Sequence, residues 1–138
     1  MIGIIKDIID VAKALFGFKE SLMKANQQKR NEMADYFQAV SKCLTVTYKK
    51  LLADEVPHDR CAELEQYAIL LPSVVKGFIE DAKAKELSGI LLRSHAVEGL
   101  WEDFNRNPKK KRQLPKIAEA SGIFLALSNS IRTGFVPR

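Results

Sequence analysis

The most constraining feature of this sequence is a run of apolar residues whose spacing alternates between four and three positions. Between residues 33 and 51 its members are Met33, Phe37, Val40, Leu44, Thr47 and Leu51. This spacing places every member on one face of an α-helix, because a helical turn takes about 3.6 residues. A second run of the same kind comprises Cys61, Leu64, Ala68, Leu71, Val75 and Phe78. Such runs predict helices that pack face to face, and strand-type alternation is nearly absent.

Proline and glycine divide the chain into helical segments joined by short connections. We expect helices over about residues 1–17, 19–52, 57–78 and 83–105, and a last helix that begins near Pro115 and ends near Gly134. Pro72 is expected to kink the third segment, or to split it in two, at Leu70–Leu71. Because long helices with short connections are antiparallel neighbours, we predict one all-α domain over residues 1–138. It is an antiparallel four-helix bundle over residues 19–134 with an additional amphipathic helix at residues 1–17.

The last helix carries small residues at every fourth position, Ala118, Gly122 and Ala126. A stripe of small side chains lets a neighbouring helix approach closely. We interpret it as a groove that receives bulky neighbours such as Trp101.

Composition and motifs disfavour an enzyme or a metalloprotein. With 138 residues, 46% of them hydrophobic, the chain is an ordinary globular domain. Cys43, His58, Cys61 and His95 lack the spacing of a zinc site, and both cysteines fall on or beside the apolar runs, which predicts buried thiols. No phosphate-binding loop, nucleophile elbow or pair of buried carboxylates is recognisable. We therefore expect no catalytic residues, no metal and no cofactor.

The first segment is unusually apolar for a surface helix. On a helical wheel Lys6, Asp10 and Lys13 cluster, and an apolar arc of about 200° covers most of the remainder. No signal peptide and no conventional membrane-spanning helix is expected, because charges interrupt every apolar stretch. Three interpretations remain open: a helix docked on the bundle, a helix lying in a membrane interface, and several copies whose charged faces line a shared lumen.

A basic loop is the second feature that could carry function. The net charge is +5, and the stretch from Phe104 to Lys116 alone carries +6 without an acidic residue. Its centre, Lys109, Lys110, Lys111 and Arg112, could contact anionic lipid or another polyanion, or could simply be a solvated connection. No aromatic side chain is interleaved for base stacking, which disfavours nucleic acid.

An apolar first helix, with the sequence Met1-Ile-Gly-Ile-Ile-Lys-Asp-Ile-Ile-Asp-Val-Ala-Lys-Ala-Leu-Phe16, precedes a helical bundle that has no catalytic signature. This layout resembles the HeLo superfamily of fungal cell-death execution domains and their bacterial analogues, the Bell domains. It is also similar to the N-terminal bundle of the mixed-lineage kinase-like necroptosis executioner. Such domains are latent toxins that oligomerise when an upstream receptor templates a C-terminal amyloid-forming motif. No Gln/Asn-rich segment follows Ile131 in this sequence, which departs from that pattern.

The resemblance implies roles for particular residues of this chain. Gly17 would be a hinge, and Lys6, Asp10 and Lys13 would face a lumen. The membrane-inserting side would consist of Ile2, Ile5, Ile8, Ile9, Leu15 and Phe16.

We therefore expect a pore-forming or membrane-perturbing cell-death effector in immune or anti-phage signalling, latent until oligomerised. It would be cytoplasmic at rest and at the plasma membrane on activation, with membrane lipids, further copies of itself and an amyloid-signalling receptor as partners. The alternative is a soluble helical adaptor that binds a protein or, through the basic loop, nucleic acid.

Overall fold

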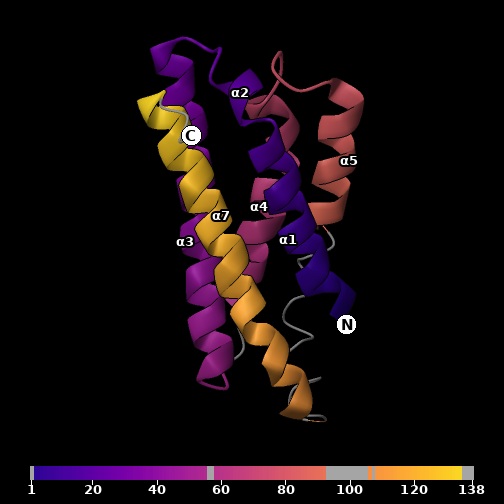
Figure 1. The fold of residues 1–138 in the computed structure, drawn as a ribbon. Coiled ribbons are helices and arrows are strands. Elements are labelled where there is room, and N and C mark those ends of the chain that lie inside the picture. Colours follow the sequence, from indigo (N-terminus) through magenta and orange to yellow (C-terminus); the bar gives the residue numbers. More distant parts are fainter. Residues whose placement is uncertain (1, 56–57, 93–105, 107, 135–138) are drawn as a thin grey trace.

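The computed structural model describes residues 2–55, 58–92, 106 and 108–134, with side chains for all of these except residues 2–4, 58–61, 108, 110 and 111. The fold is all-helical, as predicted, and the described residues contain no strand. Six α-helices and one 3-10 helix are present in this part of the chain (Figure 1): α1 (Ile2–Gly17), α2 (Lys19–Leu22), α3 (Gln27–Leu52), α4 (His58–Val74), α5 (Asp81–Leu92), η2 (Pro108–Gln113) and α7 (Leu114–Thr133).

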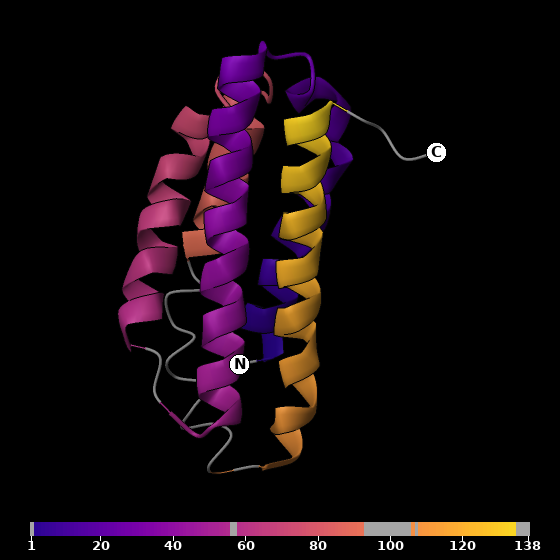
Figure 2. The same ribbon diagram turned by 90° about the vertical axis from the view of Figure 1, so that its left-hand side faces the viewer.

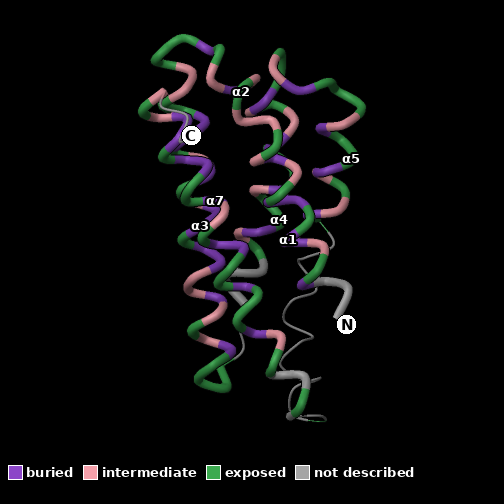
Figure 3. The backbone as a smooth tube through the Cα atoms, in the orientation of Figure 1, coloured by how far each residue is buried: buried purple, intermediate pink, exposed green. Residues whose placement is uncertain are grey.

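The five long helices surround one core. Helix α3 packs against α7 and α4, and α4 packs against α5. Helix α1 completes the ring of helices, because it packs against both α5 and α7 (Figures 1 and 2). Each helix carries both buried and exposed residues along its length (Figure 3), as expected for amphipathic helices around a shared core. Helix α1 is therefore one wall of the core.

Helices α3 and α7 form the most extensive pair (Figure 2). Every member of the predicted run on α3 is buried, and Phe37 stacks on Phe124 of α7 with 6.3 Å between the ring centroids. Beside this apolar contact, Ser41 and Ser121 each donate a hydroxyl hydrogen bond to the other's backbone carbonyl, both at 2.8 Å. Seven residues away on each helix, the Ser128 hydroxyl donates to the Ala34 carbonyl at 2.7 Å. Small hydroxyl side chains thus join the two backbones directly.

The predicted helix over residues 19–52 is divided in the structure. Helix α2 ends at Leu22, and Asn26 starts α3 as an N-cap, with its backbone extended and its side-chain oxygen accepting from the Lys29 amide at 2.8 Å. An Asn side chain in this position satisfies an amide that has no partner within the helix. The local cap therefore prevails over continuous helical periodicity.

Helix α4 continues through Pro72 to Val74 and is not split at Leu70–Leu71; a kink there stays a prediction. A proline has no amide hydrogen, so the carbonyl four residues earlier loses its usual partner. Here that carbonyl belongs to Ala68, and it accepts a hydrogen bond of 2.6 Å from the Ser88 hydroxyl on α5. The neighbouring carbonyl, of Tyr67, accepts from the Tyr36 hydroxyl on α3. Helices α3 and α5 thus support α4 close to its proline.

The second half of the chain follows the predicted segments where it is described. The helix expected over residues 83–105 begins at Asp81 and is described to Leu92; the rest of it, with His95 and Trp101, lies outside the described residues. Helix α7 starts at Leu114 and ends at Thr133, and Gly134 caps it in a left-handed conformation with φ +69°, which glycine adopts at no steric cost.

The hydrogen bond between Ser88 and Ala68 gives a prediction about stability. Replacing Ser88 by alanine should lower the free energy of unfolding by about 1–2 kcal/mol, because it leaves the Ala68 carbonyl without its partner in a half-buried site. In a Pro72→Ala background the same replacement should lower the free energy of unfolding by less, because residue 72 then has an amide that can donate to the Ala68 carbonyl. Urea unfolding followed by circular dichroism measures all four chains, and an equal loss in both backgrounds would contradict this account.

Candidate functional site

Helix α1 buries its apolar side and exposes three of its four charged residues. Ile5, Ile8 and Leu15 are no more than 1% exposed, and Ile9 is also buried, whereas Phe16 is half-buried. The predicted lumen-facing residues Lys6, Asp10 and Lys13 are all exposed. Ile2 belongs to α1, but its side chain lies outside the described residues. Of the three interpretations left open by the sequence, the structure shows the docked helix.

The docking of α1 is energetically large. Five aliphatic side chains of this helix are buried: Ile5, Ile8, Ile9, Val11 and Leu15. At roughly 1.5–3 kcal/mol for each, they contribute on the order of 10 kcal/mol, which is comparable to the whole stability of an ordinary domain. Helix α1 can therefore leave the core only if another apolar environment receives it.

The end of α1 is a one-residue break. The Phe18 amide donates to the Leu15 carbonyl at 3.0 Å, and the Leu22 amide donates to the Phe18 carbonyl at 3.1 Å, so α2 follows almost without interruption. Gly17 is exposed, and a Cβ atom at this position would meet nothing within 4 Å. The local structure therefore does not require glycine, and the hinge role of Gly17 stays a prediction.

The basic segment is helical where the sequence predicted a loop. Residues Pro108–Gln113 form the 3-10 helix η2, which leads directly into α7. Lys109 and Arg112 are exposed, whereas the side chains of Lys110 and Lys111 lie outside the described residues. Pro108 accounts for part of this difference, because its fixed φ favours a helical turn at that position.

The structure brings α1 and the basic segment to the same end of the molecule. Helices α1 and α7 run side by side in the same direction (Figure 1), and η2 contacts both of them. A groove of about 270 Å³ between the two helices is lined by Lys6, Ile9, Asp10, Lys13, Gln113, Lys116 and Glu119. The predicted lumen-facing residues and the start of α7 thus share one surface, a proximity that periodicity along the sequence does not encode.

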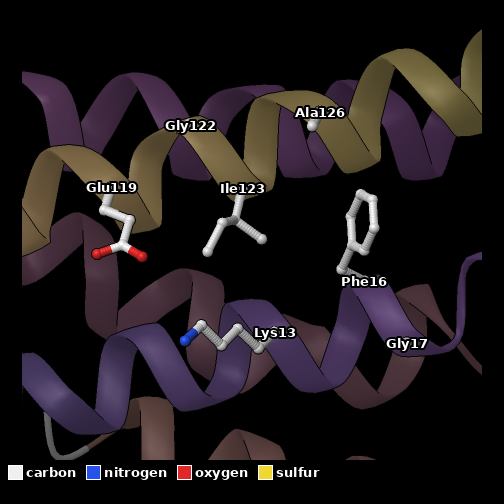
Figure 4. Close-up of a pocket in the computed structure, with 7 residues that line it drawn as sticks. All are labelled: Lys13, Phe16, Gly17, Glu119, Gly122, Ile123 and Ala126. Carbon is white, nitrogen blue, oxygen red and sulfur yellow. The ribbon is translucent and has the colours of Figure 1, made fainter.

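A second groove continues along α1 and α7 and is mainly apolar. It has a volume of about 470 Å³ and is lined by Lys13, Phe16, Gly17, Glu119, Gly122, Ile123 and Ala126 (Figure 4). The small-residue stripe was predicted to receive bulky neighbours, but Ala118, Gly122 and Ala126 are exposed in the structure. Within the described part of the chain, a Cβ atom on Gly122 would meet nothing within 4 Å. Trp101, the expected neighbour, lies outside the described residues.

The other side chains that could carry chemistry are Tyr36, Cys43, His58 and Cys61. Burial raises the pKa of Tyr36, and the nearby Tyr67 raises it further. The Tyr36 hydroxyl donates to the Tyr67 carbonyl and so remains protonated. Cys43 is buried, and the side chains of His58 and Cys61 are outside the described set. No group of three or more potential metal ligands occurs among the described residues.

Two findings bound the functional interpretation. Among the described helices none is both long enough and apolar enough to cross a membrane. Comparison of the chain with models of known protein families, with curated proteins and with solved structures finds no match. The function is therefore argued from the arrangement of α1, η2 and α7.

The burial of α1 gives a prediction about stability. Leu15→Ala should lower the free energy of unfolding by about 2–5 kcal/mol, because it leaves a cavity in the core. Asp10→Ala, on the exposed side of the same helix, should change it by less than about 0.5 kcal/mol. Denaturant titration of both variants measures the difference. If α1 were detached in solution, the two variants would be equally stable.

Proposed function

We propose that this chain is a latent membrane-perturbing domain of the cell-death-effector kind, similar to HeLo and Bell domains. In this proposal residues 19–134 form a four-helix bundle that is cytoplasmic at rest, and α1 is held against it. Oligomerisation, templated by an upstream receptor of the amyloid-signalling type, releases α1 into the plasma membrane. The biological setting is immune or anti-phage signalling, in which membrane damage kills the cell.

The observation that supports this proposal is the shared location of α1 and the basic segment. Helices α1 and α7 are parallel, so the beginning of α1 lies at the same end of the molecule as η2 (Figure 1). Exposed basic residues at this end include Lys6, Lys109, Arg112 and Lys116. Each Lys or Arg near an anionic membrane contributes about 1 kcal/mol of attraction. A bundle held by these residues presents the start of its most apolar helix to the bilayer.

Helix α1 has the dimensions and polarity for a shared lumen. Its 16 residues measure about 24 Å, close to the hydrocarbon thickness of a thin bilayer. A single copy would expose Lys6, Asp10 and Lys13 to lipid at a cost of several kcal/mol. Several copies can instead turn these charges toward common water while their aliphatic side chains face lipid, an environment as apolar as the core they leave.

The structure also indicates why such a protein would be latent. Departure of α1 uncovers the faces of α5 and α7 that it covered at rest. One molecule alone therefore exchanges a buried contact for an exposed apolar surface, which is unfavourable by many kcal/mol. Oligomerisation removes this penalty because neighbouring copies cover the uncovered faces. The requirement for assembly thus follows from the position of α1 in the core.

The leakage prediction requires α1 to be trapped without being removed, because deletion of residues 1–17 would open the core. Asp10 and Gln113 line the groove between α1 and the start of α7. Asp10→Cys and Gln113→Cys can therefore be joined by a bis-methanethiosulfonate linker, which a reductant cleaves, with Cys43 and Cys61 replaced by alanine. Oligomers forced through a fused C-terminal tag should release dye from anionic vesicles when unlinked. Linked oligomers should not, and cleavage of the linker should restore release.

A linker that leaves α1 mobile is the control for this experiment. Gln28→Cys and Glu32→Cys are both exposed and lie one turn apart on α3, so joining them constrains only that helix. This chain should release dye whether linked or not. Release by oligomers linked between positions 10 and 113, or intact vesicles with every chain, would contradict the proposal; the second result would favour the adaptor.

The basic segment gives a separate prediction about lipid binding. Neutralising Lys109 and Arg112 to alanine should weaken binding to anionic vesicles about 30-fold, because two contacts of about 1 kcal/mol are lost. Lys24 and Lys76 are exposed in the connections at the opposite end of the molecule (Figure 1), and their double replacement by alanine makes the same change in net charge. Vesicle sedimentation should show little effect of this control pair. Equal losses for the two pairs would contradict a directed contact.

A further inference from the structure

The two walls of the apolar groove are complementary to each other. The wall formed by α1 carries a cation, Lys13, and a bulky ring, Phe16 (Figure 4). The wall formed by α7 carries an anion, Glu119, and the small residues Gly122 and Ala126. One wall thus offers positive charge and bulk, and the opposite wall offers negative charge and space.

These features also stand in the same order along the groove. Lys13 and Glu119 both line the boundary with the neighbouring polar groove. Lys13 lies opposite Ile123, and its side chain extends toward the level of Glu119 (Figure 4). Phe16 and Ala126 lie further along, toward the ends of α1 and α7 (Figure 4). Lys13 and Glu119 form no ion pair within the described part of the chain, and both are exposed. Their charges are therefore available to another molecule.

We propose that the occupant of this groove is a second copy of the chain, related by a two-fold axis that runs along the groove. Such an axis keeps helix direction and exchanges the walls, so α1 of one copy faces α7 of the other. The Lys13 side chain then reaches toward Glu119 of the second copy, and Phe16 lies over its Ala126. Every contact occurs twice, as an isologous interface requires.

The polarity of the helices gives this dimer a direction. Because α1 and α7 are parallel, a two-fold axis along them leaves both copies pointing the same way. Both α1 helices therefore begin at one end of the dimer, together with both basic segments. This dimer keeps α1 docked, so it is an assembly of the resting protein and is separate from the assembly that follows release of α1 in the proposed function. An antiparallel arrangement whose axis crosses the groove at Lys13 would instead place the two Lys13 side chains near each other, where like charges repel.

Blocking the small-residue wall tests the dimer. Gly122→Leu should raise the dissociation constant at least about tenfold, because the added side chain protrudes from the wall of α7 that the second copy contacts. Gly89→Leu on α5 is the matched control: both glycines are exposed within helices, and a Cβ atom on either meets nothing within 4 Å. Both variants should fold, since leucine is the better helix former. Sedimentation equilibrium from about 10 µM to about 1 mM measures the constants, a range suited to a small interface.

Charge exchange tests the register. Lys13→Glu and Glu119→Lys should each weaken the dimer severalfold at low salt, and the chain with both changes should recover to within about threefold of the original. An original chain that stays monomeric to about 1 mM, equal constants for the two leucine variants, or no recovery in the double variant would each overturn the dimer. These measurements use no membrane and no tag. Their failure is thus distinguishable from failure of the leakage experiment, in which the tag forces assembly.

Discussion

Burial of the apolar side of α1 between α5 and α7 is the interaction on which the rest of the structure depends. Without it the remaining helices form an open arc, and the apolar residues of α5 and α7 that face α1 would meet water. Five described aliphatic side chains of α1 are almost wholly inaccessible, namely Ile5, Ile8, Ile9, Val11 and Leu15. This contact therefore carries a free energy comparable to that of the domain itself. The first helix is thus both the most membrane-like segment of the chain and a necessary part of its folded core.

In the proposed function these two properties compete for the same side chains, and the competition would be the physical basis of latency. In water the core is the best environment for Ile5, Ile8 and Leu15. A bilayer offers them an equivalent environment but leaves the other helices uncovered, so the exchange becomes favourable only when assembly covers those helices. The equilibrium is then set by protein concentration and by the anionic surface. A loosely tethered first helix would lack such control and would promote aggregation.

The sequence predicted the helices better than their mutual arrangement. Periodicity along α3 identified the buried run from Met33 to Leu51, and Gly134 marked the end of α7, because both signals are local. The division before Asn26 was missed, although an asparagine followed by a helical pattern is a recognised cap. The hydrogen bond from Ser88 to the Ala68 carbonyl, four residues before Pro72, joins two helices and has no local signal. The parallel pairing of α1 with α7, and the groove it creates, likewise depend on tertiary packing.

The hydroxyl contacts between α3 and α7 restrict how this molecule can change shape. Hydrogen bonds hold the two helices together at two positions that are seven residues apart. One position pairs Ser41 with Ser121, and the other pairs Ala34 with Ser128. Sliding one helix along the other by a single turn would remove buried hydroxyl groups from their acceptors, at a cost of about 1–3 kcal/mol for each group. Shear between these helices is therefore unfavourable, because the hydrogen bonds at both positions would have to break. We expect α3 and α7 to move together as one rigid unit. Rearrangement would then involve the other helices.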